Sequence, residues 1–96
     1  MAKFSQNHKN HQQLHHELEE AHELVKVGGV YAHFKYPKNT YKVLELAVLE
    51  ATSEVCVIYQ ATYDEKLIFV RPLSSWLETP EWEGKKVARF QLVTSL

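Results

Sequence analysis

The spacing of apolar residues changes at Gly28-Gly29, and this change constrains the fold more than any other feature. Before it, apolar residues recur at steps of four, three and four, namely Leu14, Leu18, Ala21 and Val25. That spacing is the period of an α-helix. After it, short runs rich in β-branched and aromatic residues alternate with turn residues, which is typical of strands. We therefore predict an N-terminal helical extension, residues 1–27, followed by a β domain, residues 28–96.

The extension is predicted to form one amphipathic helix over roughly residues 10 to 26. Ser5 or Asn10 can cap its start, because each side-chain oxygen accepts an early backbone N–H. The Gly28-Gly29 pair supplies the positive φ that often ends a helix. The apolar stripe has to be covered, so we expect a monomer whose helix docks on the β domain, or a helix-mediated homodimer.

The β domain is predicted to contain five strands, over 29–35, 40–49, 54–63, 66–71 and 87–93. The strands are short and closely spaced, which favours an antiparallel meander over βαβ units. The segment Pro72–Leu77 breaks the strand pattern and is expected to form a helical turn. Because closure removes exposed strand edges, we predict a mainly β protein, a small antiparallel β-barrel with an N-terminal amphipathic α-helix.

Length, charge and cysteine content limit the function classes. The chain has 96 residues, enough for one small domain, and a formal charge of −1, which gives no field for strong non-specific nucleic-acid binding. Cys56 is the only cysteine and excludes an intramolecular disulfide. The first residues lack the apolar run of a signal peptide, and no apolar stretch is long enough to span a bilayer. We expect a cytoplasmic protein without membrane association.

All but one of the candidate binding residues lie on three predicted strands. Tyr31, His33 and Lys35 alternate with Val30, Ala32 and Phe34, so one strand face is expected to meet the core and the other to present an aromatic, a titratable and a cationic group. These six residues are contiguous from position 30 to 35.

A second strand brings an arginine to the same region. Arg71 ends the strand 66–71, and it can converge with that row and with Tyr59 or Tyr63 if the strands are neighbours. Such a set suits an anionic or planar ligand, because Arg offers a charged planar fork and tyrosines offer stacking area. In the alternative interpretation, Arg71 pairs with Glu78 and fixes the turn after the strand, while the tyrosines fill the ends of the barrel.

Other reactive residue types indicate no catalytic or metal centre. His11 and His15 lie one helical turn apart among five histidines of the extension, the others being His8, His16 and His22. Nothing nearby supplies cysteine or fixed further ligands, so we expect a solvated helix face rather than a zinc or nickel site. Cys56 lies between two valines, where a thiol is usually buried and inert. No phosphate loop, paired-carboxylate motif or nucleophile elbow is present, so we predict no cofactor.

Several short motifs of the β domain match one known pattern. A Gly-x-Tyr-x-His-Tyr-Lys motif is present as Gly29, Tyr31, His33, Phe34 and Lys35. A Trp-Val-Arg-Pro motif is present as Phe69, Val70, Arg71 and Pro72. Smaller blocks follow the same pattern at Tyr41 and Val43, at Val57, Tyr59 and Tyr63, at Trp76 and Glu78, and at Gly84, Arg89 and Phe90. In these blocks the chain resembles the bacterial domain-of-unknown-function 1653 family. The resemblance implies a small SH3-like barrel and carries no established activity.

These observations together predict a non-catalytic binding or interaction module. Its aromatic and basic groove is expected to take a peptide, a nucleotide or a short nucleic-acid segment. The predicted ligand-binding residues are Tyr31, His33, Lys35, Tyr59, Tyr63, Arg71 and Glu78. The alternative is a small enzyme or enzyme subunit that uses His33 with Glu78 or a tyrosine as an acid–base pair.

Overall fold

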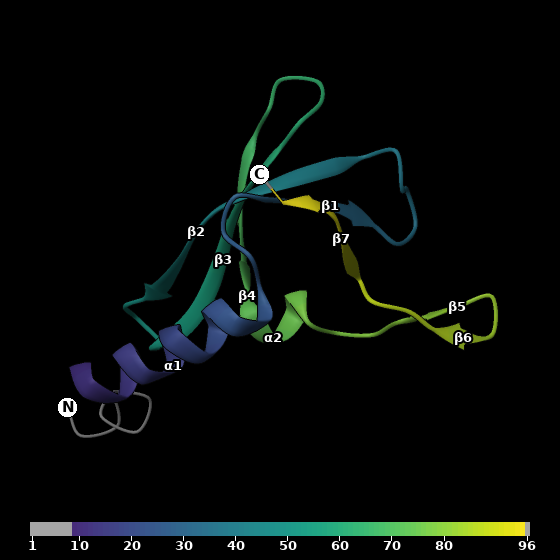
Figure 1. Ribbon diagram of the computed structural model, residues 1–96. Helices are drawn as coiled ribbons and strands as arrows, with labels where there is room; N and C mark the ends of the chain where they lie inside the picture. Colours follow the sequence, from purple (N-terminus) through teal and green to yellow (C-terminus); the bar gives the residue numbers. More distant parts are fainter. Residues whose placement is uncertain (1–8, 96) are drawn as a thin grey trace.

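The predicted N-terminal helix is present as α1 (His11–Leu24) in the computed structural model, which describes residues 9–95 (Figure 1). Asn10 caps it: its side-chain oxygen accepts the Gln13 backbone N–H at 2.7 Å, and the Gln13 side chain accepts the Asn10 N–H at 3.0 Å. Ser5, the other predicted cap, lies outside the described residues. The helix ends at Leu24, and its C-cap is Val25, whose backbone is extended with φ −130°. The prediction that the Gly28-Gly29 pair ends the helix is therefore wrong, because the positive φ of Gly28 comes three residues after the cap. No helix among the described residues is long and apolar enough to span a membrane.

The apolar stripe of α1 is covered by the sheet. Ala21 and Val25 are fully buried, and Leu18 packs against the same core. They meet strands β2 (Thr40–Leu49) and β3 (Glu54–Ala61), whose Val43 and Val57 are also fully buried. The predicted docking of the helix on the β domain is therefore present in the structure.

The central sheet contains five antiparallel strands in the order β4-β3-β2-β1-β7. Its remaining strands are β1 (Gly29–His33), β4 (Ile68–Pro72) and β7 (Phe90–Ser95). Each predicted strand is present, and only the ends differ by a few residues. The inner row of β3 is Val55, Val57, Tyr59 and Ala61.

The sheet is open, so the predicted closed barrel is wrong. Strands β4 and β7 are the two ends of the sheet, and no pairing joins them among residues 9–95. With every neighbour antiparallel, the two end strands run in the same direction, so direct closure would require a parallel pair. Side chains from the two ends of the sheet still meet: the Arg71 guanidinium of β4 lies 5.5 Å from the ring centroid of Phe90 in β7, on which Trp76 stacks with ring centroids 3.9 Å apart.

Two short elements connect β4 to β7. The helical turn predicted after Pro72 is α2 (Leu73–Trp76), which buries Trp76 in the core. A hairpin of β5 (Glu81–Trp82) and β6 (Lys85–Lys86) follows and extends away from the sheet (Figure 1). The five predicted strands do not include this hairpin. Glu83 and Gly84 both have positive φ, 54° and 84°, as a two-residue hairpin turn requires.

Candidate functional site

Arg71 is the central cation of the candidate site. Its Nε donates to the Tyr59 hydroxyl at 3.2 Å, and its Nη1 donates to the Ser75 hydroxyl at 2.8 Å. These neutral groups orient the guanidinium without neutralising it, and no carboxylate forms an ion pair with Arg71 among residues 9–95. An arginine has five N–H donors, so three remain after these two bonds. The half-buried cation is therefore fixed in position and able to receive an anion.

Aromatic rings surround this cation. A pocket of about 210 Å³, here called the aromatic pocket, is lined by His33, Tyr41, Tyr59, Phe69, Arg71 and Phe90. Tyr59 is central in it, packing edge-on against Tyr41 at 5.5 Å and tilted against Phe69 at 5.7 Å between ring centroids. The lining comes from all five strands of the central sheet, so the fold itself positions these rings. A flat or apolar group would find stacking partners there, next to the guanidinium.

Positive charges lie near the aromatic pocket, and they affect the pKa of His33. Burial lowers the pKa of His33 most, and the positive charges of Arg89, Arg71 and Lys35 lower it further. The Nδ1 atom of His33 accepts the Lys35 backbone N–H at 3.0 Å, which leaves Nε2 to carry the proton of the neutral ring. Near neutral pH the imidazole is therefore an uncharged member of a cationic site.

Three of the seven predicted residues meet in the aromatic pocket, namely His33, Tyr59 and Arg71. Tyr31 does not: it belongs to the core, its ring packs edge-on against Trp76, and its hydroxyl accepts the Lys26 backbone N–H at 2.9 Å. The predicted division of this strand into a core face and an open face is wrong, because both faces are covered. On the other face Ala32 is buried, and Trp82 of the hairpin packs against Phe34. Lys35 is exposed just beyond the end of β1.

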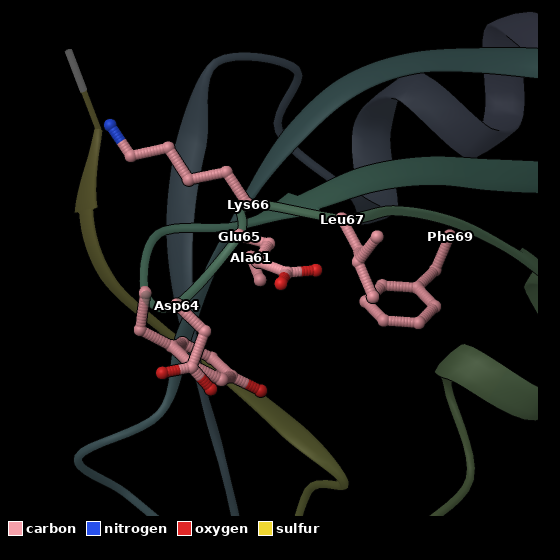
Figure 2. A pocket seen from close by; sticks show the side chains of 7 residues that line it. Ala61, Asp64, Glu65, Lys66, Leu67 and Phe69 are labelled. Carbon is pink, nitrogen blue, oxygen red and sulfur yellow. The ribbon is translucent and has the colours of Figure 1, made fainter.

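Tyr63 lines a different cavity, at the β3–β4 hairpin. This hairpin pocket has a volume of about 570 Å³ and is lined by Ala61, Tyr63, Asp64, Glu65, Lys66, Leu67 and Phe69. Figure 2 shows the two carboxylates, Asp64 and Glu65, on its loop side and the side chains of Leu67 and Phe69 on the strand side. It is larger than the aromatic pocket, but its cation is accompanied by two acids. We therefore place the candidate site at the aromatic pocket, whose lining holds a cation and no acid.

The tyrosines between the two cavities are held together. The Tyr41 and Tyr63 hydroxyls share a hydrogen bond of 2.5 Å, and their rings pack edge-on at 5.6 Å. Burial raises the pKa of Tyr41 most, and the hydrogen bond to Tyr63 raises it further. Tyr41 is thus a neutral wall of the pocket and does not act as a base near neutral pH.

Glu78 pairs with Arg89 and not with Arg71. The Glu78 Oε1 atom accepts from Arg89 Nη2 at 2.8 Å. A backbone hydrogen bond explains why Glu78 pairs with Arg89: the Arg89 N–H donates to the Glu78 carbonyl at 3.0 Å and aligns the two side chains. The proposed Arg71–Glu78 pair that would fix the turn is therefore wrong, and Ser75 within α2 fixes Arg71 instead.

The acid–base pairing considered for an enzyme is not formed. Within residues 9–95, His33 makes no hydrogen bond or ion pair with Glu78, whose carboxylate is held by Arg89. Cys56 is buried, as expected, and burial followed by the nearby Glu54 charge raises the pKa of its thiol. The burial of Cys56 and the raised pKa of its thiol weigh against nucleophilic chemistry at this residue.

Two of the four histidines of α1 form exposed pairs with glutamates. His15 lies 3.5 Å from Glu19, and His16 lies 3.5 Å from Glu20. No group of three potential metal ligands occurs between residues 9 and 95, and His8 lies outside that range.

Sequence reasoning missed three residues of the aromatic pocket: Tyr41, Phe69 and Phe90. Phe69 carried a usable signal, since it lies two residues before Arg71 on the same strand and therefore on the same face. Tyr41 reaches the pocket because of the strand order, and Phe90 because of the strand order and its packing against Trp76. Neither the strand order nor this packing can be predicted from a local sequence pattern.

Comparison with known proteins supports the sequence resemblance. A family model described as "Protein of unknown function (DUF1653)" matches residues 29–92. The crystal structure of a protein belonging to that family, from Bordetella bronchiseptica, superposes with a TM-score of 0.63 at 32% sequence identity. The match covers 72% of this chain and 88% of the other. No curated protein matches the chain.

Proposed function

The chain belongs to the DUF1653 family, and we propose that it is a non-catalytic binding module whose ligand enters the aromatic pocket. The ligand is a peptide, a nucleotide or a short nucleic-acid segment that carries an acidic group beside a flat or apolar group. The acidic group binds the Arg71 guanidinium, and the flat or apolar group packs on Tyr59, Phe69 and the other rings.

One observation carries this proposal: the orientation of Arg71 is fixed by two neutral hydroxyls, while no acid among the described residues balances its charge. A partly buried cation costs desolvation energy, which a charged ligand would offset. The neighbouring arginine provides the contrast, because Arg89 has Glu78 at 2.8 Å.

Binding of small probes tests the proposal. We would titrate the ¹⁵N-labelled full chain with adenosine monophosphate, with a five-residue oligothymidylate and with the end-capped peptide TVTETVT. At least one probe is expected to cause saturable shifts at the Arg71 Nε–H and at the amides of Phe69 and His33. If none of the three shifts these resonances at millimolar concentration, the proposed function is wrong.

Two variants identify the cation responsible. Arg71→Met should weaken binding ~10-fold or more, because it removes charge-assisted hydrogen bonds. Lys86→Met is the matched control, since it removes one exposed positive charge on the β5–β6 hairpin and should leave the affinity unchanged. Equal effects of both variants would show that the probe responds to net charge and not to the pocket.

A further inference from the structure

Strand β4 presents free backbone groups at the edge of the sheet. It is the terminal strand, and it pairs with β3 in a register that joins Tyr59 to Phe69 and Ile58 to Val70. The Ala61 N–H donates to the Leu67 carbonyl at 2.9 Å. Hydrogen-bonded and non-hydrogen-bonded pairs alternate in an antiparallel ladder, so Phe69 and Arg71 direct their backbone groups toward β3. The N–H and C=O groups of Ile68 and Val70 therefore point outward, away from β3.

The apolar run Leu67–Val70 at this edge lacks the features that protect edges, which occur only at the end of the strand as Arg71 and Pro72. Leu67, Ile68, Phe69 and Val70 are 58%, 57%, 39% and 62% exposed, so four consecutive apolar residues face solvent. Neither a charged residue nor a proline interrupts them, and the ladder between β3 and β4 has no register shift. The ladders of β1 with β7 and of β2 with β3 each contain one. A regular apolar edge of this kind is suited to receive another strand.

The geometry of strand addition would bring a ligand side chain to Arg71. A strand antiparallel to β4 would hydrogen-bond with Ile68 and Val70, so its pairs with Phe69 and Arg71 would be of the non-hydrogen-bonded type. Side chains in such pairs are the closer ones, with Cα atoms roughly 4.5 Å apart. Phe69 and Arg71 both line the aromatic pocket. A residue opposite Arg71 would thus project its side chain to the pocket side of the sheet.

We propose that the ligand is an extended peptide that adds to the edge of β4 as an antiparallel strand and places an Asp or Glu carboxylate on Arg71. This inference rests on the proposed function and narrows its ligand to one class. Main-chain hydrogen bonds to Ile68 and Val70 hold the peptide, and the carboxylate selects it. An apolar side chain two residues further along the peptide packs on Phe69.

Charge complementarity favours this occupant over a second copy of the chain. The symmetric self-pairing that satisfies the same backbone groups joins Ile68 of one copy to Val70 of the other. In that register Arg71 lies opposite Leu67 of the second copy, so its charge stays unbalanced. An acidic peptide satisfies the edge and the guanidinium together.

The test uses two end-capped peptides, TVTETVT and TVTQTVT, which differ by one charge. Their central residue shares a strand face with both valines, so the acid and an apolar side chain reach Arg71 and Phe69 together. Amide hydrogen exchange of the full chain is measured with and without each peptide. With TVTETVT we expect the Ile68 and Val70 amides to exchange at least ~5-fold more slowly, with Phe69 and Arg71 changing little because β3 already binds them. We expect TVTQTVT to bind ~10-fold more weakly.

A protein variant isolates the edge from the pocket. Val70→Pro removes an N–H that the β3 ladder does not use, and proline is tolerated at edge positions of this kind. It should abolish binding of TVTETVT, whereas Val70→Thr, which keeps the N–H, should retain it.

Methylated peptides give the same information without altering the protein. Methylating the amide of the Thr after Glu blocks a bond to β4 and should abolish binding. Methylating the Glu amide, whose N–H points away from β4, should leave binding unchanged.

The outcomes separate the two proposals. Shifts at Arg71 and Phe69 without slowed exchange at Ile68 and Val70, or unchanged binding to Val70→Pro, would overturn strand addition and leave the proposed function standing. If neither peptide, nor adenosine monophosphate, nor the oligothymidylate causes any shift, both strand addition and the proposed function are wrong. Equal binding of TVTQTVT would show that Arg71 does not select the acid. Sedimentation showing a dimer that Val70→Pro dissociates would assign the edge to a second copy instead.

Discussion

The helix-covered centre of the sheet and its β4 edge contain the same kinds of residues but use them differently. At the centre, Val43 and Val57 are fully buried in the same core cluster as Val25, the C-cap of α1. At the edge, Ile68 and Val70 are more than half exposed, although no residue type distinguishes them from the buried set. Apolar surface that folding does not cover is a feature of binding surfaces. We therefore expect stability to depend mainly on the centre, and the proposed ligand to contact the edge.

Removing α1 should have the largest effect on stability. We expect residues 28–96 to keep a cooperative thermal transition, because the strands and the aromatic core remain. Loss of the buried Val25 and its neighbours should cost about 3 kcal/mol, a decrease in Tm on the order of 10–20 °C. Calorimetry of the full and truncated chains measures this. A truncated chain without a cooperative transition would show that the helix is indispensable to the core, and the predicted division at Gly28 would be wrong.

The same substitution at two valines, Val57 at the centre and Val70 at the edge, tests this comparison. Val57→Ala should lower the free energy of unfolding by about 2 kcal/mol, since it leaves a cavity beneath α1. Val70→Ala should change it by less than about 0.5 kcal/mol, because the side chain is already solvated. Urea denaturation of both variants gives the two values. Similar losses would mean that β4 is as important for folding as the centre.

Local patterns predicted the elements well because they depend on local physics. The four-three-four spacing, the Asn10 cap and the alternation within each strand are contained in a few neighbouring residues. Closure of the barrel was predicted from the cost of free edges, and that argument failed. It does not include the strand directions: with five antiparallel strands the two end strands, β4 and β7, run in the same direction and cannot close as an antiparallel pair.

The candidate site was predicted only in part, because some of its contacts follow from local sequence and others do not. Arg71 and Tyr59 meet because β3 and β4 are a hairpin, so their neighbourhood was foreseeable from the sequence. Tyr31 was assigned to the wrong environment, since the hairpin that covers the other face of β1 carries only a two-residue turn signal. Glu78 was matched with the nearer arginine in sequence, whereas a backbone hydrogen bond aligns it with Arg89.

The two faces of α1 offer a smaller test. Leu18 packs against the core, whereas Leu24 is 60% exposed on the same helix. Leu18→Glu should lower stability by about 1–2 kcal/mol, because it places a charge against the apolar sheet, and Leu24→Glu should have little effect. Urea denaturation measures the stability of both variants.

Sedimentation of the same proteins tests the association of α1. The wild type is expected to sediment as a monomer at all concentrations. A dimeric wild type that Leu18→Glu converts to a folded monomer would contradict docking as the role of the stripe.

The smallest expected effect is the titration of His33, which compares the empty and the occupied pocket. Its pKa is lowered by burial and by Arg89, Arg71 and Lys35, so its NMR titration midpoint should lie below 6.5. The unfolded chain then binds a proton at His33 more readily than the native chain does. The contribution of neutral His33 to the free energy of unfolding is therefore fully present above pH 6.5. It declines as the pH falls from 6.5 toward the native midpoint. His33→Gln should remove that part of the decline.

An acid on Arg71 should reverse part of this shift. A carboxylate in the pocket favours the imidazolium, so saturation with TVTETVT should raise the His33 midpoint, and binding should take up a proton between the two midpoints. A neutral peptide that packs on the same rings adds burial without charge, so TVTQTVT should leave the midpoint unchanged or lower it. A rise of equal size with both peptides would mean that the shift comes from a rearrangement of the three cations. In that case the ligand's charge would not be the cause, and the assignment of the anion to this pocket would fail.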